Sequence, residues 1–128
     1  MAADLGAPGT SRSFGDTIRA GLSEVASYAH AVGVAKNLVI PRTADDTLGV
    51  PSGLVDATHS ARLKVHAYTF GNENTFLPAE LRRSHRDGDY GAAFAEYRAF
   101  LCAGVDGVFS DNPDTAVAAR AAVLTAAA

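Results

Sequence analysis

The amino-acid sequence predicts a small α/β protein with a parallel sheet. Helical and strand-like patterns alternate along the chain in the order α-β-α-β-α-β-α, which is typical of a parallel sheet covered by helices. The composition is that of a globular protein, with 48% hydrophobic and 20% charged residues. Three parallel strands cannot close a barrel and leave two exposed edges. We therefore expect either a small open domain or part of a larger structure.

The first elements follow a polar lead-in. Residues 1–15 are predicted to be disordered and lack the features of a secretory signal. A helix is expected next, because apolar residues recur at helical spacing between Asp16, a suitable N-cap, and Gly33, a natural stop. The β-branched run that follows predicts a buried strand at Leu38–Ile40, ended by Pro41.

A second helix and strand are expected in the middle of the chain. Ser52 is a suitable cap for a helix with Leu54 and Val55 facing inward. In the segment LKVHAYTF, apolar and small residues from Leu63 to Thr69 alternate with polar and aromatic ones, which predicts a strand. Residues 71–91 form a long loop, and such loops are uncommon unless functional or flexible.

The last third predicts a helix, a strand and a helix. The segment AAFAEYRAFLCAG reads as a helix with Phe94, Tyr97 and Leu101 on its inner stripe and Gly104 as its terminator. Cys102 is expected to be a small core residue at the buried side of this helix. The strand VDGVFS follows. The final helix is expected to begin at Asp114 or Thr115, and its Ala-rich tail at 122–128 is expected to fray.

Charge and composition exclude several classes of protein. The formal net charge of −3 gives no basic footprint for nucleic acid. No apolar run approaches the roughly 20 residues that span a bilayer. A short basic cluster, residues 82–86, is interpreted as a solvated loop. His85, Asp87 and Asp89 do not match a calcium-binding loop and indicate a turn. The single cysteine excludes an internal disulfide.

Candidate functional residues gather where the predicted strands end, because parallel α/β folds bind ligands at the carboxyl ends of their strands. Lys36 and Arg42, near the end of the first strand, are candidates for binding a phosphate oxygen. The later strands contribute an imidazole, two aromatic rings and two carboxylates. These candidates are His66, Tyr68, Phe70, Glu73 and Asp111. The set suits a small polar molecule with negative charge.

Each of these residues also has a purely structural interpretation. His66 is compatible with an ordinary half-buried histidine, and Tyr68 and Phe70 with core aromatics. Asp111 is compatible with a cap for the last helix or an Asx turn. Glu73 is compatible with a solvated loop residue. The sequence pattern leaves both interpretations open for all five.

Two segments then resemble a known family. The stretches VHAYTFGNEN and GVDGVFSDNPD are similar to the seventh and eighth strands of bacterial glycerophosphodiester phosphodiesterases, which read VHPYTFRNEN and GVDGVFTDFPD. The stretch LSEVASYAHAVGVAKNLVIP resembles the preceding helix and strand of that family. The resemblance runs from Leu22 to Arg120. It implies a partial (β/α)8 TIM barrel, with residues 16–121 as its last three βα units, strands 6–8.

The resemblance also implies a reaction and a site. The family hydrolyses glycerophosphodiesters to glycerol 3-phosphate and an alcohol, a step of phospholipid and glycerol metabolism, with a divalent cation, commonly Ca²⁺ or Mg²⁺. Matching positions make His66, Tyr68, Phe70 and Asp111 the expected substrate-binding residues. The sequence departs from the family at Gly71, where the family has arginine, and at Ala67, where it has proline.

The family's catalytic motifs, HRG, PENT and ExD, do not occur here in the right context. We therefore expect no catalytic or metal-binding residue in this chain, no cation bound by it alone, and no activity of the isolated chain. The expected partners are a glycerophosphodiester and either the remaining N-terminal half of a barrel or a second copy. The alternatives are a non-catalytic remnant that binds a ligand or partner, and a fragment that does not fold alone. Family members are often periplasmic or secreted, but the sequence predicts no compartment for this chain.

Overall fold

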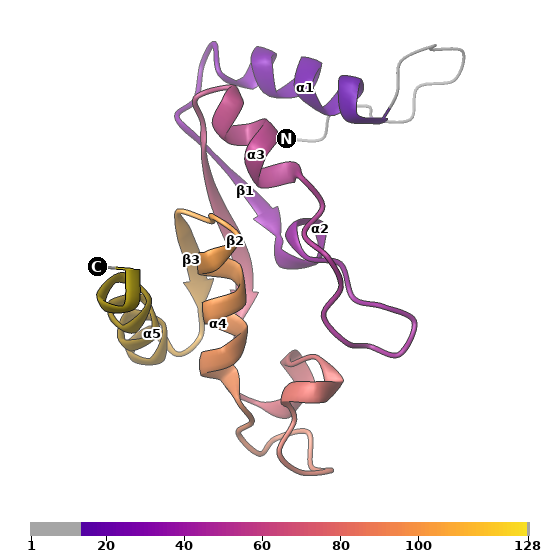
Figure 1. The fold of residues 1–128 in the computed structure, drawn as a ribbon, viewed down its shortest axis with the longest axis vertical. Helices are drawn as coiled ribbons and strands as arrows, with labels where there is room; N and C mark the ends of the chain where they lie inside the picture. The colour runs from indigo at the N-terminus through magenta and orange to yellow at the C-terminus, as the bar shows by residue number, and fades with distance from the viewer. Residues whose placement is uncertain (1–13, 128) are drawn as a thin grey trace.

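Three strands form one parallel sheet at the centre of the molecule. The computed structural model describes residues 14–127, and the strands β1 (Ala31–Ala35), β2 (Lys64–Phe70) and β3 (Gly107–Ser110) lie in the order β1-β2-β3 (Figure 1). Both neighbouring pairs are parallel. The parallel sheet and the alternation of helices and strands confirm the α/β class that the sequence predicted.

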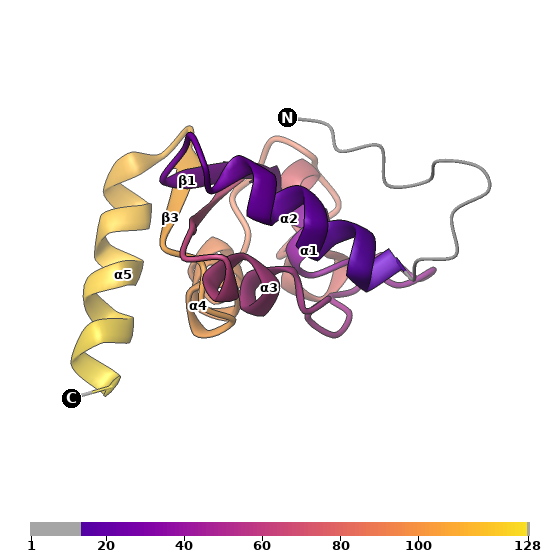
Figure 2. The same cartoon turned by 90° about the horizontal axis from the view of Figure 1, so that it is seen from above.

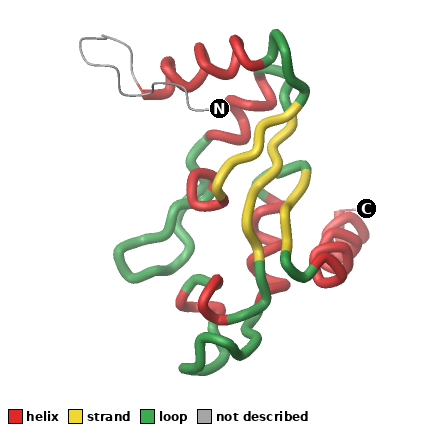
Figure 3. Tube along the Cα trace, turned by 180° about the vertical axis from the view of Figure 1, so that it is seen from behind, coloured by secondary structure: helices red, strands yellow, loops and turns green. Residues whose placement is uncertain are grey.

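Helices cover one face of this sheet. The longer helices are α1 (Phe14–Val25), α3 (Leu54–Ser60), α4 (Ala93–Cys102) and α5 (Pro113–Ala127). Viewed from behind, the strands lie in front of α3 and α4, and no helix crosses in front of them (Figure 3). From above, α5 stands at one side of the molecule, next to β3 (Figure 2). The sheet therefore has a packed face and an open face.

The main core lies between the packed face and the helices. Val65, Ala67 and Phe70 of β2 are buried against Tyr97 and Phe100 of α4. A second, smaller apolar cluster joins α1 to the start of β2 through Leu22, Val25 and Leu63. No helix within residues 14–127 is long and apolar enough to cross a membrane.

The first predicted boundaries are wrong. The helix begins at Phe14 and ends at Val25, so Asp16 is not its cap, and Gly33 lies inside β1 instead of ending the helix. The predicted strand Leu38–Ile40 falls mainly in a single helical turn, α2 (Lys36–Val39). A short apolar run does not distinguish a buried strand from a buried helical turn. Most of the predicted lead-in lies outside the described residues.

The later elements are closer to expectation. The N-cap of helix α3 is Gly53, with a φ of 85°, and not Ser52 as predicted. The Ser52 hydroxyl still accepts a hydrogen bond of 3.3 Å from the Leu54 N–H. Helix α4 and strand β3 form where predicted. Phe94, however, is exposed, and so is Cys102, which corrects its interpretation as a core residue.

The alternation of β2 changes before the strand ends. Val65 and Ala67 face the core as predicted, but Tyr68 and Thr69 are both exposed and Phe70 is buried. The pairing of β2 with β3 shifts register between Ala67 and Phe70. This shift turns Phe70 to the packed face, so the prediction that Thr69 faces inward is wrong.

The loop at 71–91 is ordered around one buried asparagine. Asn74, at the start of the short turn η1 (Asn74–Phe76), donates from its side-chain amide to the Arg86 carbonyl at 2.8 Å. Its Oδ1 accepts the Arg83 N–H at 3.1 Å. A second short turn, η2 (Ala79–Leu81), follows. Residues 82–90 are exposed, as the solvated-loop interpretation of the basic cluster expected.

Candidate functional site

The open face of the sheet carries three of the predicted site residues. His66 and Tyr68 alternate with the buried residues of β2, which places both on the open face. On β3, Gly107 pairs beside His66, so the same alternation places Phe109 on that face too. Asp111 is the first residue after β3, and we infer its side from a continuation of this alternation. Tyr68 and Phe109 are 43% and 55% exposed. An imidazole, two aromatic rings and a carboxylate thus share one surface toward the carboxyl ends of the strands.

Phe70 lies on the opposite face. Its ring is stacked on Tyr97 and meets Phe100 edge-on, with a centroid distance of 5.1 Å in each pair. The side chain is 1% exposed. The Lys36 ammonium lies 4.9 Å from the ring centroid. In this structure Phe70 is a core residue, so the candidate site on the open face comprises His66, Tyr68 and Asp111 without it.

Asp111 is not used as a helix cap. Helix α5 begins at Pro113, and the bond that opens it runs from the Ala116 N–H to the Asn112 carbonyl at 3.2 Å. Among the described residues, no hydrogen bond or ion pair involves the Asp111 carboxylate, and only its backbone N–H is bonded, to the Phe70 carbonyl at 2.9 Å. The interpretation of Asp111 as only a cap is therefore wrong, and its carboxylate is free to meet a ligand.

Two asparagines fix the turn that presents Asp111. The Asn112 Oδ1 accepts the backbone N–H of Asn72 at 3.0 Å, and the Asn72 amide donates to the Thr115 hydroxyl at 2.9 Å. The Asn112 N–H donates to the Ser110 hydroxyl at 2.9 Å, and that hydroxyl also bonds Tyr97. We call Asn72 and Asn112 the asparagine clamp. It joins the ends of β2 and β3 on both sides of Asp111.

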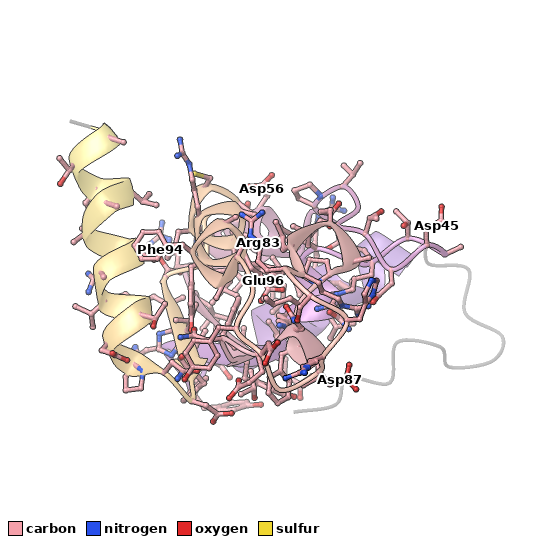
Figure 4. All side chains as sticks on the ribbon, turned by 90° about the horizontal axis from the view of Figure 1, so that it is seen from below. Asp45, Asp56, Arg83, Asp87, Phe94 and Glu96 are labelled. Atoms are coloured by element: carbon pink, nitrogen blue, oxygen red, sulfur yellow. The ribbon has the colours of Figure 1, made fainter. Side chains whose placement is uncertain are left out.

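A buried charge cluster lies at the same end of the sheet, behind the open face. The Lys36 ammonium donates to Glu96 Oε1 at 2.9 Å, and the Arg42 guanidinium lies 3.5 Å from Glu96 Oε2. Both cations also donate to the Phe76 carbonyl, at 3.0 and 2.7 Å. We call Lys36, Arg42 and Glu96 the Glu96 cluster. Figure 4 shows Glu96 among packed side chains, with Asp45 and Asp87 at the periphery.

Burial dominates the titration of this cluster. It raises the pKa of Glu96 above 4.5, although Lys36 and Arg42 act in the opposite direction. Burial likewise lowers the pKa of Lys36 below 10.5, against the attraction of Glu96. Lys36 and Arg42 were candidates for binding phosphate, but here both bind Glu96 and the Phe76 carbonyl, and Arg42 also pairs with Asp46 at 3.2 Å. Their contribution is to tie the segment after β1 to α4 and the 71–91 loop.

The remaining candidates do not form a metal site. Glu73 is half-buried, and its Oε2 has no hydrogen-bond partner. Within residues 14–127, no three His, Cys, Asp or Glu side chains lie together as metal ligands would. These residues therefore do not fit the divalent cation that the family resemblance implies.

Several site residues were missed from the sequence. Phe109 has a visible signal, because it lies two residues from both Gly107 and Asp111 on one strand. Glu96 has none, since a charged residue in a helix is normally solvated. The two asparagines of the clamp have only a weak signal, their positions immediately after predicted strands.

The fold and the site define a class. A parallel sheet with helices on one face, and polar residues converging where its strands end, is consistent with part of a βα-barrel that binds ligands at that end. Residues 15–115 match the model of the glycerophosphoryl diester phosphodiesterase family, and the chain belongs to that family.

A curated relative agrees. Over 91 residues the chain is 34% identical to glycerophosphodiester phosphodiesterase GDPD6 of Arabidopsis thaliana. The match covers 70% of this chain but 22% of the plant protein. The chain thus spans about a fifth of the relative that it matches.

Proposed function

We propose that this chain is the C-terminal part, strands 6–8, of a glycerophosphodiester phosphodiesterase barrel of the bacterial type. The whole enzyme would hydrolyse glycerophosphodiesters to glycerol 3-phosphate and an alcohol. Family membership, the parallel βα units and the paired strand signatures support this assignment. The observation that carries the proposal is the convergence of His66, Tyr68 and Asp111 on the open face of the sheet.

These residues suit a phosphodiester with hydroxyl groups. An imidazole donates to a phosphoryl oxygen or accepts from a hydroxyl, according to its protonation. The Tyr68 ring packs against the carbon atoms of the glycerol or head group, and its hydroxyl offers a donor. The unpaired Asp111 carboxylate accepts from a glycerol hydroxyl. Phe70 supports this surface from behind, through the core.

In this proposal the chain binds and orients substrate, and the remaining strands of the barrel supply catalysis. The family's HRG, PENT and ExD motifs are not found in the sequence in the right context, and the described residues do not assemble a metal site. In this proposal a divalent cation is not held by this chain. Its ligands, and the groups that move protons, would come from the N-terminal part of a barrel, which would also cover the open face.

Complementation tests this proposal. The 128-residue chain would be purified alone, and also co-expressed with the first five βα units of a family member. Hydrolysis of glycerophosphocholine would be measured with Mg²⁺ or Ca²⁺. We expect activity only in the co-expressed pair, and less of it with Asp111→Asn. Hydrolysis by the chain alone would contradict the division of roles.

The alternative is a non-catalytic remnant that binds a ligand or partner. The open sheet face and the two free strand edges favour association with another chain. Gel filtration separates this alternative from an unfolded fragment, because a compact monomer or dimer indicates a folded module. If the pair shows no activity but the chain is compact and binds glycerol 3-phosphate, the remnant is the better description.

A further inference from the structure

One row of the open face contains a histidine between two glycines. The strand register pairs Gly33 of β1 with His66 of β2, and His66 with Gly107 of β3. With hydrogen in place of side chains on both sides, the imidazole has room to lie over either neighbouring strand. Contacts next to Gly33, His66 and Gly107 therefore decide toward which strand the imidazole leans.

The imidazole leans over Gly107. A Cβ atom at position 107 would lie 3.0 Å from His66 Cδ2 and 3.4 Å from Nε2. A Cβ atom at position 33 would meet only the His66 carbonyl oxygen, at 4.0 Å. The two glycines differ in role, because Gly107 provides the surface on which the ring lies and Gly33 borders open space.

Phe109 bounds this position on the side toward the carboxyl end. Its ring meets the imidazole edge-on, with 6.3 Å between the ring centroids and 70° between the ring planes. Phe109 follows Gly107 by two residues on the same strand, so both contacts come from β3. The imidazole thus lies over Gly107 and is bounded on one side by the phenyl ring of Phe109. We call these two surfaces its floor and its wall.

We propose that Gly107 and Phe109 are positioning residues that seat the His66 imidazole over β3 and leave the space above Gly33 open for a ligand. The consequence for catalysis depends on the proposed function, in which His66 contacts the phosphodiester. An imidazole has two distinct nitrogens, and the orientation of the ring decides which one faces a ligand. We call Gly107 and Phe109 the seat of the His66 ring. Loss of the seat would let the ring reorient and present its other nitrogen to a ligand, although the histidine itself is retained.

The seat can be tested on the full chain by nuclear magnetic resonance with isotope-labelled histidine rings. Gly107→Ala removes the floor, and Gly33→Ala is the matched control in the same row. Neither glycine has a left-handed φ, so alanine adds a side chain without backbone strain. We expect the His66 ring resonances to move in Gly107→Ala and to stay unchanged in Gly33→Ala. Equal responses in the two variants would overturn the proposal.

Phe109→Leu provides a second variant if Gly107→Ala does not fold. It removes the phenyl ring, so the His66 ring protons should lose the shift that this ring imposes, while backbone resonances far from β3 stay in place. Unchanged His66 ring resonances in Phe109→Leu would also overturn the seat.

Addition of glycerol 3-phosphate to the wild-type chain tests ligand binding at His66 separately from the positioning of its ring. A shift of the His66 resonances supports ligand contact at this ring. A seat confirmed by the variants, with no response to glycerol 3-phosphate, would leave the positioning intact and count against the proposed ligand.

Discussion

The two ends of the sheet differ in the hydrogen bonding of their carboxylates and in the direction in which the pKa of each is shifted. At the amino end, Asp106 Oδ2 accepts the Val65 N–H and bonds His59 Nε2, each at 2.8 Å. Burial alone would raise the pKa of Asp106, but these two hydrogen bonds, together with the attraction of His59 and Lys64, outweigh it and hold the pKa below 3.8. This carboxylate is partly exposed and binds both partners through Oδ2, so it stabilises the fold in its charged form.

At the carboxyl end, Glu96 is almost completely buried, and its pKa is raised. Its Oε2 has no hydrogen bond, and the buried oxygens Asn72 Oδ1 and Glu73 Oε2 lack one as well. In the described part of the chain, all the buried side-chain oxygens that lack a hydrogen bond lie at the carboxyl end, although Glu96 Oε2 still has the Arg42 guanidinium 3.5 Å away. Polar groups that are not optimised for stability are expected at functional sites. This difference is what we expect if the amino end maintains the fold and the carboxyl end binds a ligand, as proposed above.

The largest effect is expected from Glu96→Ala. It leaves the buried Lys36 ammonium beneath the 71–91 loop without a carboxylate, while Arg42 keeps its ion pair with Asp46 at 3.2 Å. An uncompensated buried charge costs about 3–5 kcal/mol. Urea unfolding measures the loss. The double variant Lys36→Met with Glu96→Leu should recover a large part of it, because it removes a charge of each sign. If Glu96→Ala lowers the free energy of unfolding by less than about 1 kcal/mol, the Glu96 cluster is no stronger than a surface ion pair.

Breaking the asparagine clamp should have the next largest effect. Asn112→Ala removes the acceptor of the Asn72 N–H, and an unsatisfied buried donor costs about 1–3 kcal/mol. Amide hydrogen exchange at Asn72 should accelerate. Asp111→Ala is the matched control, because this neighbouring side chain makes no hydrogen bond in the described structure. Equal losses in the two variants would mean that the turn, and not the clamp, is being disturbed.

Acid should act on the amino end through Asp106. Its folded-state pKa is depressed, so its contribution is present above its ordinary pKa of 3.8 and is lost as the pH falls through the folded-state value. Asp106→Asn should lower the free energy of unfolding by about 0.5–1 kcal/mol near neutral pH. It should also flatten the decline in acid, as urea unfolding at several pH values would show. Asp87→Asn, at an exposed position in the 71–91 loop, should leave that decline unchanged.

The smallest effect on stability is expected at the proposed ligand-facing positions. Tyr68→Phe removes an exposed hydroxyl and Asp111→Asn removes an exposed negative charge, and such surface changes usually stay within about 0.5 kcal/mol. Thermal unfolding of both variants tests this. A loss above about 1 kcal/mol would show that the open face is already covered in solution, as self-association would require.

The sequence predicted the α/β class, the positions of α4 and β3, and a set of candidate site residues at the carboxyl ends of the strands. It misplaced the first strand because two short apolar runs, at 31–35 and 38–40, both have the pattern of a buried strand. The first forms β1, and the second was predicted. It placed Phe70 beside Tyr68, since a register shift inside a strand leaves no mark on the alternation of residue types. It missed Glu96 because only tertiary packing distinguishes a buried ion pair from a solvated one.

The buried Asn74 separates the shape of the 71–91 loop from most of its sequence. Its side chain bonds mainly main-chain atoms, the Arg83 N–H and the Ser84 and Arg86 carbonyls, and its own N–H reaches the Asp89 carbonyl. Because main-chain atoms are common to all residues, exposed side chains of this loop with no hydrogen bond of their own in the described structure, such as those of Arg83 and Asp87, can be exchanged while the path of the loop is kept. Arg82 and Ser84 are exceptions, since their side chains bond within the loop. Asn74 thus fixes much of the path of this loop. The charge of its surface, next to the proposed binding end of the sheet, can therefore change through evolution or engineering while the fold is kept.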